Sequence, residues 1–357
     1  MAPMTPRRPL PSRERGLSLL ELMIALTIGM LMLTALASMY MGASNSNKEL
    51  ARSSRQIEDG RYSLQTLTDD VALAGYLGYF YWPIAPALLP DPCELNTVAT
   101  IRAGLALAVQ GYDAPAAPAA PLSGCLADAD HVAGTDVLVV RRADTNATAT
   151  GALLANEIYV QANSDVNNTS NPWVELGPFT AAKFPLLLRD SVTTAPIRKL
   201  HVHIYYVAPC SVPAAGLVSC TAAADNGNPI STLKRLELTL DAGGSRAWVV
   251  TPIAEGVENM QIDYGVDSDG DGVPDAFTMA PAAAVDWQNV VAMNIHLVVR
   301  STERTPGYSD LKTYSLGLAG TVSSTATPGG TLDPGYKRKA YVAQARVVNT
   351  ASRRETP

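Results

Sequence analysis

Four aspartates stand close together late in the chain, in the segment Asp267-Ser-Asp269-Gly-Asp271-Gly272-Val-Pro-Asp275. Aspartates at alternate positions before a turn-forming glycine supply several hard oxygen ligands around one centre, which suits Ca²⁺. Like charges so close together repel one another unless a cation lies between them. The alternative is an acidic turn that uses Asp and Gly only for its backbone conformation. We predict a Ca²⁺ site formed by these four aspartates.

A single carboxylate interrupts a long apolar run near the start of the chain. From Leu17 to Met41 the only formal charge is Glu21. A helix of this length spans about 37 Å, which is enough to cross a hydrocarbon layer of about 30 Å. A carboxylate inside such a span costs about 2.5–3.5 kcal/mol on insertion scales and is usually retained for a function. We therefore expect a membrane-spanning helix in which Glu21 has a specific partner.

The residues before this run are basic, although the whole chain of 357 residues has a net charge of −6. That overall charge provides no basic field for nucleic acid, so we expect no nucleic-acid partner. A secretory signal peptide would have an apolar region of about 7–15 residues followed by a small-residue cleavage site, whereas this run is longer and continues without a break into a helix-compatible segment. By the positive-inside rule, the leader places the N-terminus in the cytoplasm. Its basic residues are Arg7, Arg8, Arg13 and Arg15.

The four cysteines all follow the apolar run, in segments typical of loops. An even number in such sequence favours disulfides formed in an oxidising compartment. Three pairings are possible, of which we favour Cys93–Cys125 and Cys210–Cys220. The alternatives are buried free thiols, or zinc, which the spacing disfavours because no pair has the two- to four-residue separation of a zinc knuckle.

The sequence contains few residues that could perform catalysis. It has no nucleophile elbow, no phosphate-binding glycine loop and no His-Glu-x-x-His motif. His201 and His203 would share one face of a strand and could bind a metal, but the sequence indicates no third ligand. We therefore favour a structural role for both histidines and expect a protein that is not an enzyme.

The elements that position these residues follow from hydrophobic periodicity. After Met41 the sequence stays helix-compatible and continues to glycines at 75 and 78, with one apolar stripe formed by Ile57, Leu64, Leu67, Val71 and Ala74. Later segments alternate between loops and short strands with partial period-2 patterning, which is typical of antiparallel sheets. The predicted fold is α+β: a long N-terminal helix packed on an antiparallel sheet with large loop insertions. The predicted strands cover residues 136–141, 158–161, 200–207, 233–240, 247–251, 260–264, 290–300 and 340–348.

The first residues resemble the class III signal of type IV prepilins, in the order Gly16-Leu17-Ser18-Leu19-Leu20-Glu21. This resemblance implies cleavage between Gly16 and Leu17 by a prepilin peptidase, followed by N-methylation of Leu17. It also implies that Glu21 meets the N-terminal amine of a neighbouring subunit when the helices stack. A buried carboxylate and a buried ammonium are each costly alone and tolerable as a pair.

Two further parts of the sequence resemble PilW-type minor pilins. One is the helix end at residues 67–78, where paired acids precede an Ala-Gly-aromatic-x-Gly turn, and the other is the C-terminal third, with Glu255–Tyr264 before the Asp-rich loop. The resemblance implies a pilin-like fold and a non-catalytic role in assembling and priming type IV pili. The implied partners are other minor pilins, the major pilin, a tip adhesin and the inner membrane. The protein would cross that membrane once and later lie on the pilus at the cell surface.

The resulting organisation has five parts, and two other functions remain open. A type II secretion pseudopilin has the same N-terminal chemistry. A membrane-anchored, Ca²⁺-dependent adhesin would use the Asp-rich loop, which resembles EF-hand-like and thrombospondin type 3 loops but has Thr278 where an EF-hand has its bidentate Glu. The predicted parts are a cleaved leader (1–16), a membrane or fibre-core half-helix (17–41), its amphipathic continuation (42–78), a globular domain (79–349) and a polar tail (350–357).

Overall fold

The computed structural model describes residues 16, 18–79, 85–94, 96–165, 168, 170–180, 183–327 and 330–355. The chain divides into two compact units, residues 1–53 and 54–357, with most contacts between residues made within each unit. The long helix α1 (Leu19–Leu73) begins in the first unit and ends in the second. The last part of α1, which was predicted to pack on a sheet, belongs to the second unit.

The first part of α1 exposes an apolar surface. An 18-residue window of this helix has the length and hydropathy of a membrane-crossing segment, and none of that window is buried. The hydroxyls of Thr27, Thr34 and Ser38 donate to carbonyls three residues earlier in the helix, at 2.8–2.9 Å. Polar groups that are satisfied within the helix can enter hydrocarbon without leaving unpaired donors. By length and composition the segment fits the predicted span of residues 17–41.

In the second unit, α1 buries a line of mostly small or polar residues. Gln56, Gly60, Ser63, Leu67 and Asp70 recur at spacings of three and four, which place them on one face of the helix. The amide of Gln56 donates to two backbone carbonyls of the folded unit, at 2.7 and 2.9 Å. At Gly60, an added Cβ would stand 2.4 Å from a ring carbon of a tyrosine in strand β13. The helix therefore approaches the sheet closely because its contact face lacks bulk.

The helix ends at Leu73, earlier than the predicted glycine at 78, because Gly75 adopts a positive φ of 72°. A second helix, α5 (Val348–Arg354), satisfies the carbonyls left at this end. Asn349 donates to the carbonyls of residues 73 and 74 at 3.3 and 3.1 Å, and Arg353 donates to that of Gly75 at 2.5 Å. Burial lowers the pKa of Arg353 to about 10. The predicted polar tail at 350–357 is thus wrong for residues 350–354, which form part of a packed helix.

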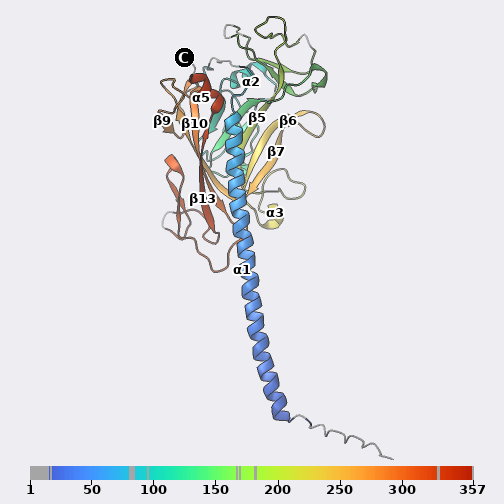
Figure 1. The fold of residues 1–357 in the computed structure, drawn as a ribbon, viewed down its shortest axis with the longest axis vertical. Coiled ribbons are helices and arrows are strands. Elements are labelled where there is room, and N and C mark those ends of the chain that lie inside the picture. Colours follow the sequence, from blue (N-terminus) through green and yellow to red (C-terminus); the bar gives the residue numbers. More distant parts are fainter. Residues whose placement is uncertain are drawn as a thin grey trace, which may run out of the picture. The chain divides into compact units, whose positions relative to one another are not determined.

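The strands form two larger antiparallel sheets and a hairpin. In the first sheet the order is β1-β2-β5-β3-β4, with β6 on β5 and β7 on β6; in the second it is β13-β10-β8-β9; β11 pairs with β12. Helix α5 packs next to β10 (Figure 1). The strands are β1 (Val109–Tyr112), β2 (Val137–Ala143), β3 (Ile158–Gln161), β4 (Trp173–Leu176), β5 (Ile197–Ala208), β6 (Thr232–Leu240), β7 (Arg246–Glu255), β8 (Val257–Val266), β9 (Ala276–Thr278), β10 (Val290–Arg300), β11 (Thr313–Ser315), β12 (Thr321–Ser323) and β13 (Arg338–Arg346). The short helices are α2 (Val98–Gly104), α3 (Ala224–Gly227) and α4 (Ala284–Gln288).

Two apolar cores lie on the two faces of the first sheet. Strand β2 shows the division: Leu138 and Val140 pack with the second sheet and α1, whereas Val137 and Val139 pack in the other core. A strand that is buried on both faces has a continuous run of apolar residues in its sequence, rather than an alternation of apolar and polar residues. The α+β prediction, a long N-terminal helix with antiparallel sheets, is confirmed, although the single sheet that was predicted is two larger sheets.

Candidate functional site

The predicted processing site precedes the helix. Gly16 is exposed, and no described residue lies within 4 Å of the position that a Cβ would take there. Leu17 lies outside the described residues. Gly16 itself is therefore accessible, close to the start of α1.

Glu21 closes the N-terminus of α1, a role that the sequence analysis missed. The backbone N–H of Ser18 donates to Oε2 of Glu21 at 3.0 Å, and the Ser18 carbonyl accepts from the N–H of Leu22 at 3.1 Å. This is one half of a capping box, for which the pattern Ser-x-x-Glu before an apolar run is the sequence signal. The carboxylate is exposed and lies at the N-terminal end of the helix, where its negative charge interacts favourably with the helix dipole. Glu21 therefore has a local partner before any subunit reaches it.

Asp70, the second of the paired acids near the helix end, anchors α1 to the first sheet. Its carboxylate accepts hydrogen bonds from Nε of Arg142 at 2.8 Å, from Nδ1 of His203 at 2.6 Å and from the hydroxyl of Tyr205 at 2.9 Å. Burial alone would raise the pKa of Asp70, but the histidine and the guanidinium hold it well below its ordinary range. The acid thus fixes the helix on β2 and β5.

The Asp-rich loop follows β8 and brings three of the four predicted ligands together. Carboxylate oxygens of Asp267, Asp269 and Asp275 lie within 4.8 Å of one another. Asp271 is not in this group; it accepts the N–H of Val273 at 2.7 Å within the turn. The structure therefore brings together three of the four predicted ligands, and Asp271 lies outside the group.

A cation of the protein itself already contacts this loop. Nε of Arg354, at the end of α5, lies 2.5 Å from Oδ2 of Asp267, and the same guanidinium donates to the Asp267 carbonyl at 2.9 Å. The buried Asp267 also accepts the N–H groups of Gly270 and Gly272, at 2.6 and 2.9 Å. Burial opposes its ionisation, yet these donors lower the pKa of Asp267. The sequence analysis missed this ion pair, which joins residues 87 positions apart.

Both favoured disulfides are present in the structure. Cys93 is bonded to Cys125, and Cys210 is bonded to Cys220. The first bond lies beside α2 and the loop after β1, and the second closes the turn after β5. These bonds fix two segments that have little regular secondary structure.

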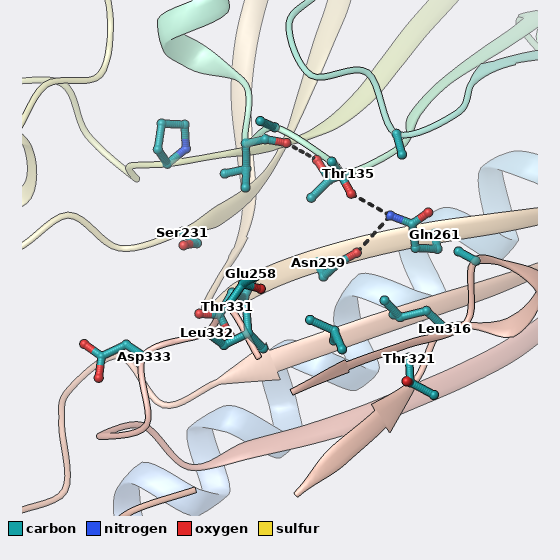
Figure 2. A pocket seen from close by; sticks show the side chains of 17 residues that line it. Thr135, Ser231, Glu258, Asn259, Gln261, Leu316, Thr321, Thr331, Leu332 and Asp333 are labelled. Carbon is teal, nitrogen blue, oxygen red and sulfur yellow. Dashed lines mark hydrogen bonds between the residues drawn. The ribbon is translucent and has the colours of Figure 1, made fainter. Parts of the chain in front are cut away.

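A groove of about 610 Å³ lies between β8, the turn at residues 132–135 and the segments 316–322 and 331–333 (Figure 2). The amide of Gln261 donates to the carbonyl of Gly134 at 2.8 Å and to the side chain of Asn259 at 3.1 Å. Glu258 is bound by a buried arginine, Arg338, at 2.6 Å. None of the described residues that line the groove is His, Cys or Lys, so they include no paired nucleophile and nitrogen base.

Family models match two parts of the chain. Residues 11–37 match the prokaryotic N-terminal methylation motif, and residues 220–349 match type IV pilus-assembly protein W. The methylation motif, the apolar helix that it overlaps and the antiparallel sheets make the chain similar to type IV pilin-like proteins. Within that class the predicted resemblance to PilW-type minor pilins is confirmed.

The similarity to individual known proteins is low. A type IV-like pilin from Thermus thermophilus matches with 15% sequence identity and a TM-score of 0.19, over 42% of this chain and 79% of that chain. No curated protein matches. The description of the fold therefore depends on the helices and strands given above.

Proposed function

We propose that this chain is a non-catalytic minor pilin that takes part in assembling and priming type IV pili. The observation that carries the proposal is the combination at the N-terminus: a methylation motif over residues 11–37 includes the first part of an exposed apolar helix, which has one carboxylate at its start. An apolar helix that is unburied in its own chain requires a lipid or protein environment. The membrane would supply the lipid environment before assembly, and the core of the pilus fibre would supply the protein environment after it.

The proposed sequence of events assigns a role to each N-terminal residue. A prepilin peptidase cleaves after Gly16 and methylates Leu17, while the chain crosses the inner membrane once with its N-terminus in the cytoplasm. Residues 17–41 then join the helices of other minor pilins and the major pilin, with a tip adhesin as a further partner. Glu21 pairs with a neighbouring N-terminal amine, which would otherwise be a costly unpaired charge in an apolar fibre core.

Substitutions at Glu21 test this assembly contact and separate it from helix capping. Glutamine can still accept the Ser18 N–H, as in a Gln capping box, but it has no charge for an amine. We expect Glu21→Gln and Glu21→Val both to insert into membranes and both to be depleted from sheared pili, by at least about tenfold, which corresponds to about 1.4 kcal/mol of lost interaction. The measurement is immunoblotting of pilus and membrane fractions.

Glu58→Gln is the matched control, because Glu58 is an exposed glutamate of α1 outside the apolar run. It should be recovered in pili like the wild type. Normal recovery of Glu21→Gln would show that the charge is not an assembly contact. In a deletion strain, loss of protein secretion with normal pili and twitching would instead identify a type II secretion pseudopilin.

The Asp-rich loop supports a second proposal, that Asp267, Asp269 and Asp275 contribute oxygens to a weak Ca²⁺ site. Arg354 already neutralises part of this charge, so an ion must compete with the guanidinium. We expect calorimetric titration of residues 42–357 to show one Ca²⁺ with an affinity of about 10⁻⁴–10⁻³ M, as in extracellular modules. Asp269→Asn should abolish the heat, and the exposed Asp128→Asn should not. No heat at millimolar Ca²⁺ would contradict the proposal.

A further inference from the structure

Two histidines and a glutamate meet on the face of the first sheet that also carries Asp70's partners. His201 and His203 are two residues apart on β5, so their side chains share a face. Glu237 stands directly opposite His203 on the neighbouring antiparallel strand β6. The structure thus supplies from β6 the third ligand that the sequence did not indicate.

One donor atom of each residue turns toward a common point. Oε1 of Glu237 lies 3.7 Å from Nδ1 of His201 and 3.8 Å from Nε2 of His203, and the three atoms all lie within 4.8 Å of one another. These distances are too long for hydrogen bonds. Both of these ring nitrogens are buried, and neither has a hydrogen-bond partner among the described residues. The side chain of His203 is only 3% exposed, so water does not readily replace the missing partner.

The other heteroatom of each residue is held by an oppositely charged group. Nδ1 of His203 lies 2.6 Å from Asp70, and Nε2 of His201 lies 3.3 Å from Asp144. In a neutral ring, an N–H that donates to a carboxylate leaves the lone pair on the other nitrogen. Burial opposes the charge of His203, but Asp70 and Glu237 raise its pKa, so a metal would take the place of the proton on Nε2. Oε2 of Glu237 accepts from Arg235 at 2.8 Å, which leaves Oε1 toward the histidines. Such carboxylate–histidine pairs are the usual outer support of metal ligands.

We propose that Nδ1 of His201, Nε2 of His203 and Oε1 of Glu237 bind one Zn²⁺ ion. Ligand atoms at 2.0–2.1 Å from tetrahedral zinc are about 3.3 Å apart, so small rotations of the side chains bring the three atoms to that spacing. Two imidazoles and one carboxylate form a donor set that suits zinc better than Ca²⁺ or Mg²⁺. The partial exposure of His201 and Glu237 provides an entry path and room for a water as fourth ligand. The site is independent of the proposed function in pili.

The test is zinc titration of the full chain without an oligohistidine tag, in detergent micelles, after metal is stripped with a chelator. We expect one Zn²⁺ per chain, and Co²⁺ should give the visible absorption of a nitrogen-ligated site. His201→Ala and Glu237→Gln should each weaken zinc binding by at least about tenfold, and Asp144→Asn, which touches only the outer support, by about 10–100-fold. Circular dichroism and the unfolding temperature in chelator report whether each variant is folded.

Asp269→Asn is the control, because the Asp-rich loop is the other described group of potential metal ligands. It should bind zinc with unchanged affinity. If a ligand variant fails to fold, Asp144→Asn is decisive, because Asp144 lies at a loop and its side chain is 34% exposed. The proposal is overturned if the wild type binds no stoichiometric zinc, or if the folded variants at residues 144, 201 and 237 bind it as tightly as the wild type.

Discussion

Replacing Gly16 with valine is expected to leave the chain as an uncleaved precursor in membranes. In the proposed class III signal the scissile bond follows Gly16 directly, and we expect the peptidase to exclude a branched side chain at that position. The substitution does not disturb the described protein itself, since no described residue lies within 4 Å of an added Cβ at Gly16. A loss of processing is therefore attributable to recognition rather than to misfolding.

Intact mass spectrometry of membrane-extracted protein measures this result. Wild type should lack residues 1–16 and carry one additional methyl group, whereas Gly16→Val should keep the leader and lack the methyl group. Gly29→Ala and Gly42→Ala are matched controls, because added Cβ atoms at these positions of α1 also meet no described residue. Both controls should be processed fully. A mature, methylated mass for Gly16→Val would contradict the assignment of the signal.

Local sequence patterns predicted most of the regular structure. Strands β3 and β10 have the predicted bounds, and β5, β6 and β8 extend beyond theirs by one to three residues at an end. The strands β1, β4, β9, β11 and β12, each of three or four residues, were missed, although β3 is equally short and was predicted; runs of this length give little periodicity. Helix α5 was missed because Val348–Arg354 is mostly polar, and its position depends on the end of α1 rather than on an apolar stripe.

The face of α1 was predicted only in part, because close packing favoured small residues over large ones. Of the predicted apolar stripe, Leu67 and Val71 are fully buried, but Ile57 and Leu64 are only half-buried. The contact face instead includes small residues such as Gly60, where the absence of a side chain leaves room for the ring of Tyr341. Hydrophobicity alone cannot indicate such a contact, since it depends on the partner strand.

Among the site residues too, those that depend on local sequence could be predicted, and those that depend on contacts between distant segments could not. The cysteine pairs could be predicted because four cysteines allow only three pairings, and the Asp-rich turn could be recognised from a short local motif. The contact between Glu237 and the two histidines depends on the register of β5 against β6, and the contact between Arg354 and Asp267 depends on where α5 packs. Neither contact can be recognised from a single sequence.

A second large effect, on the free energy of unfolding, is expected when Arg338 at the start of β13 is replaced. Its side chain is fully buried and forms ion pairs with two carboxylates, Glu258 at 2.6 Å and Asp310 at 3.2 Å. Asp310 is fully buried as well and also accepts from the hydroxyl of Tyr314 at 3.0 Å. Although burial opposes its charge, the pKa of Arg338 is raised by these acids. One guanidinium thus joins β13, β8 and the loop before β11.

Arg338→Met should lower the free energy of unfolding by about 3–5 kcal/mol, because it leaves two carboxylates at a buried site without their cation. Urea unfolding of residues 42–357, followed by tryptophan fluorescence, measures the change. Arg304→Met is the control: the Arg304–Asp333 pair is 63% and 41% exposed, so the change should be within about 0.5 kcal/mol. Adding Glu258→Gln and Asp310→Asn to Arg338→Met removes the uncompensated charges and should recover part of the loss. A loss below about 1 kcal/mol for Arg338→Met would show that water reaches these acids and that the cluster does not hold the second sheet together.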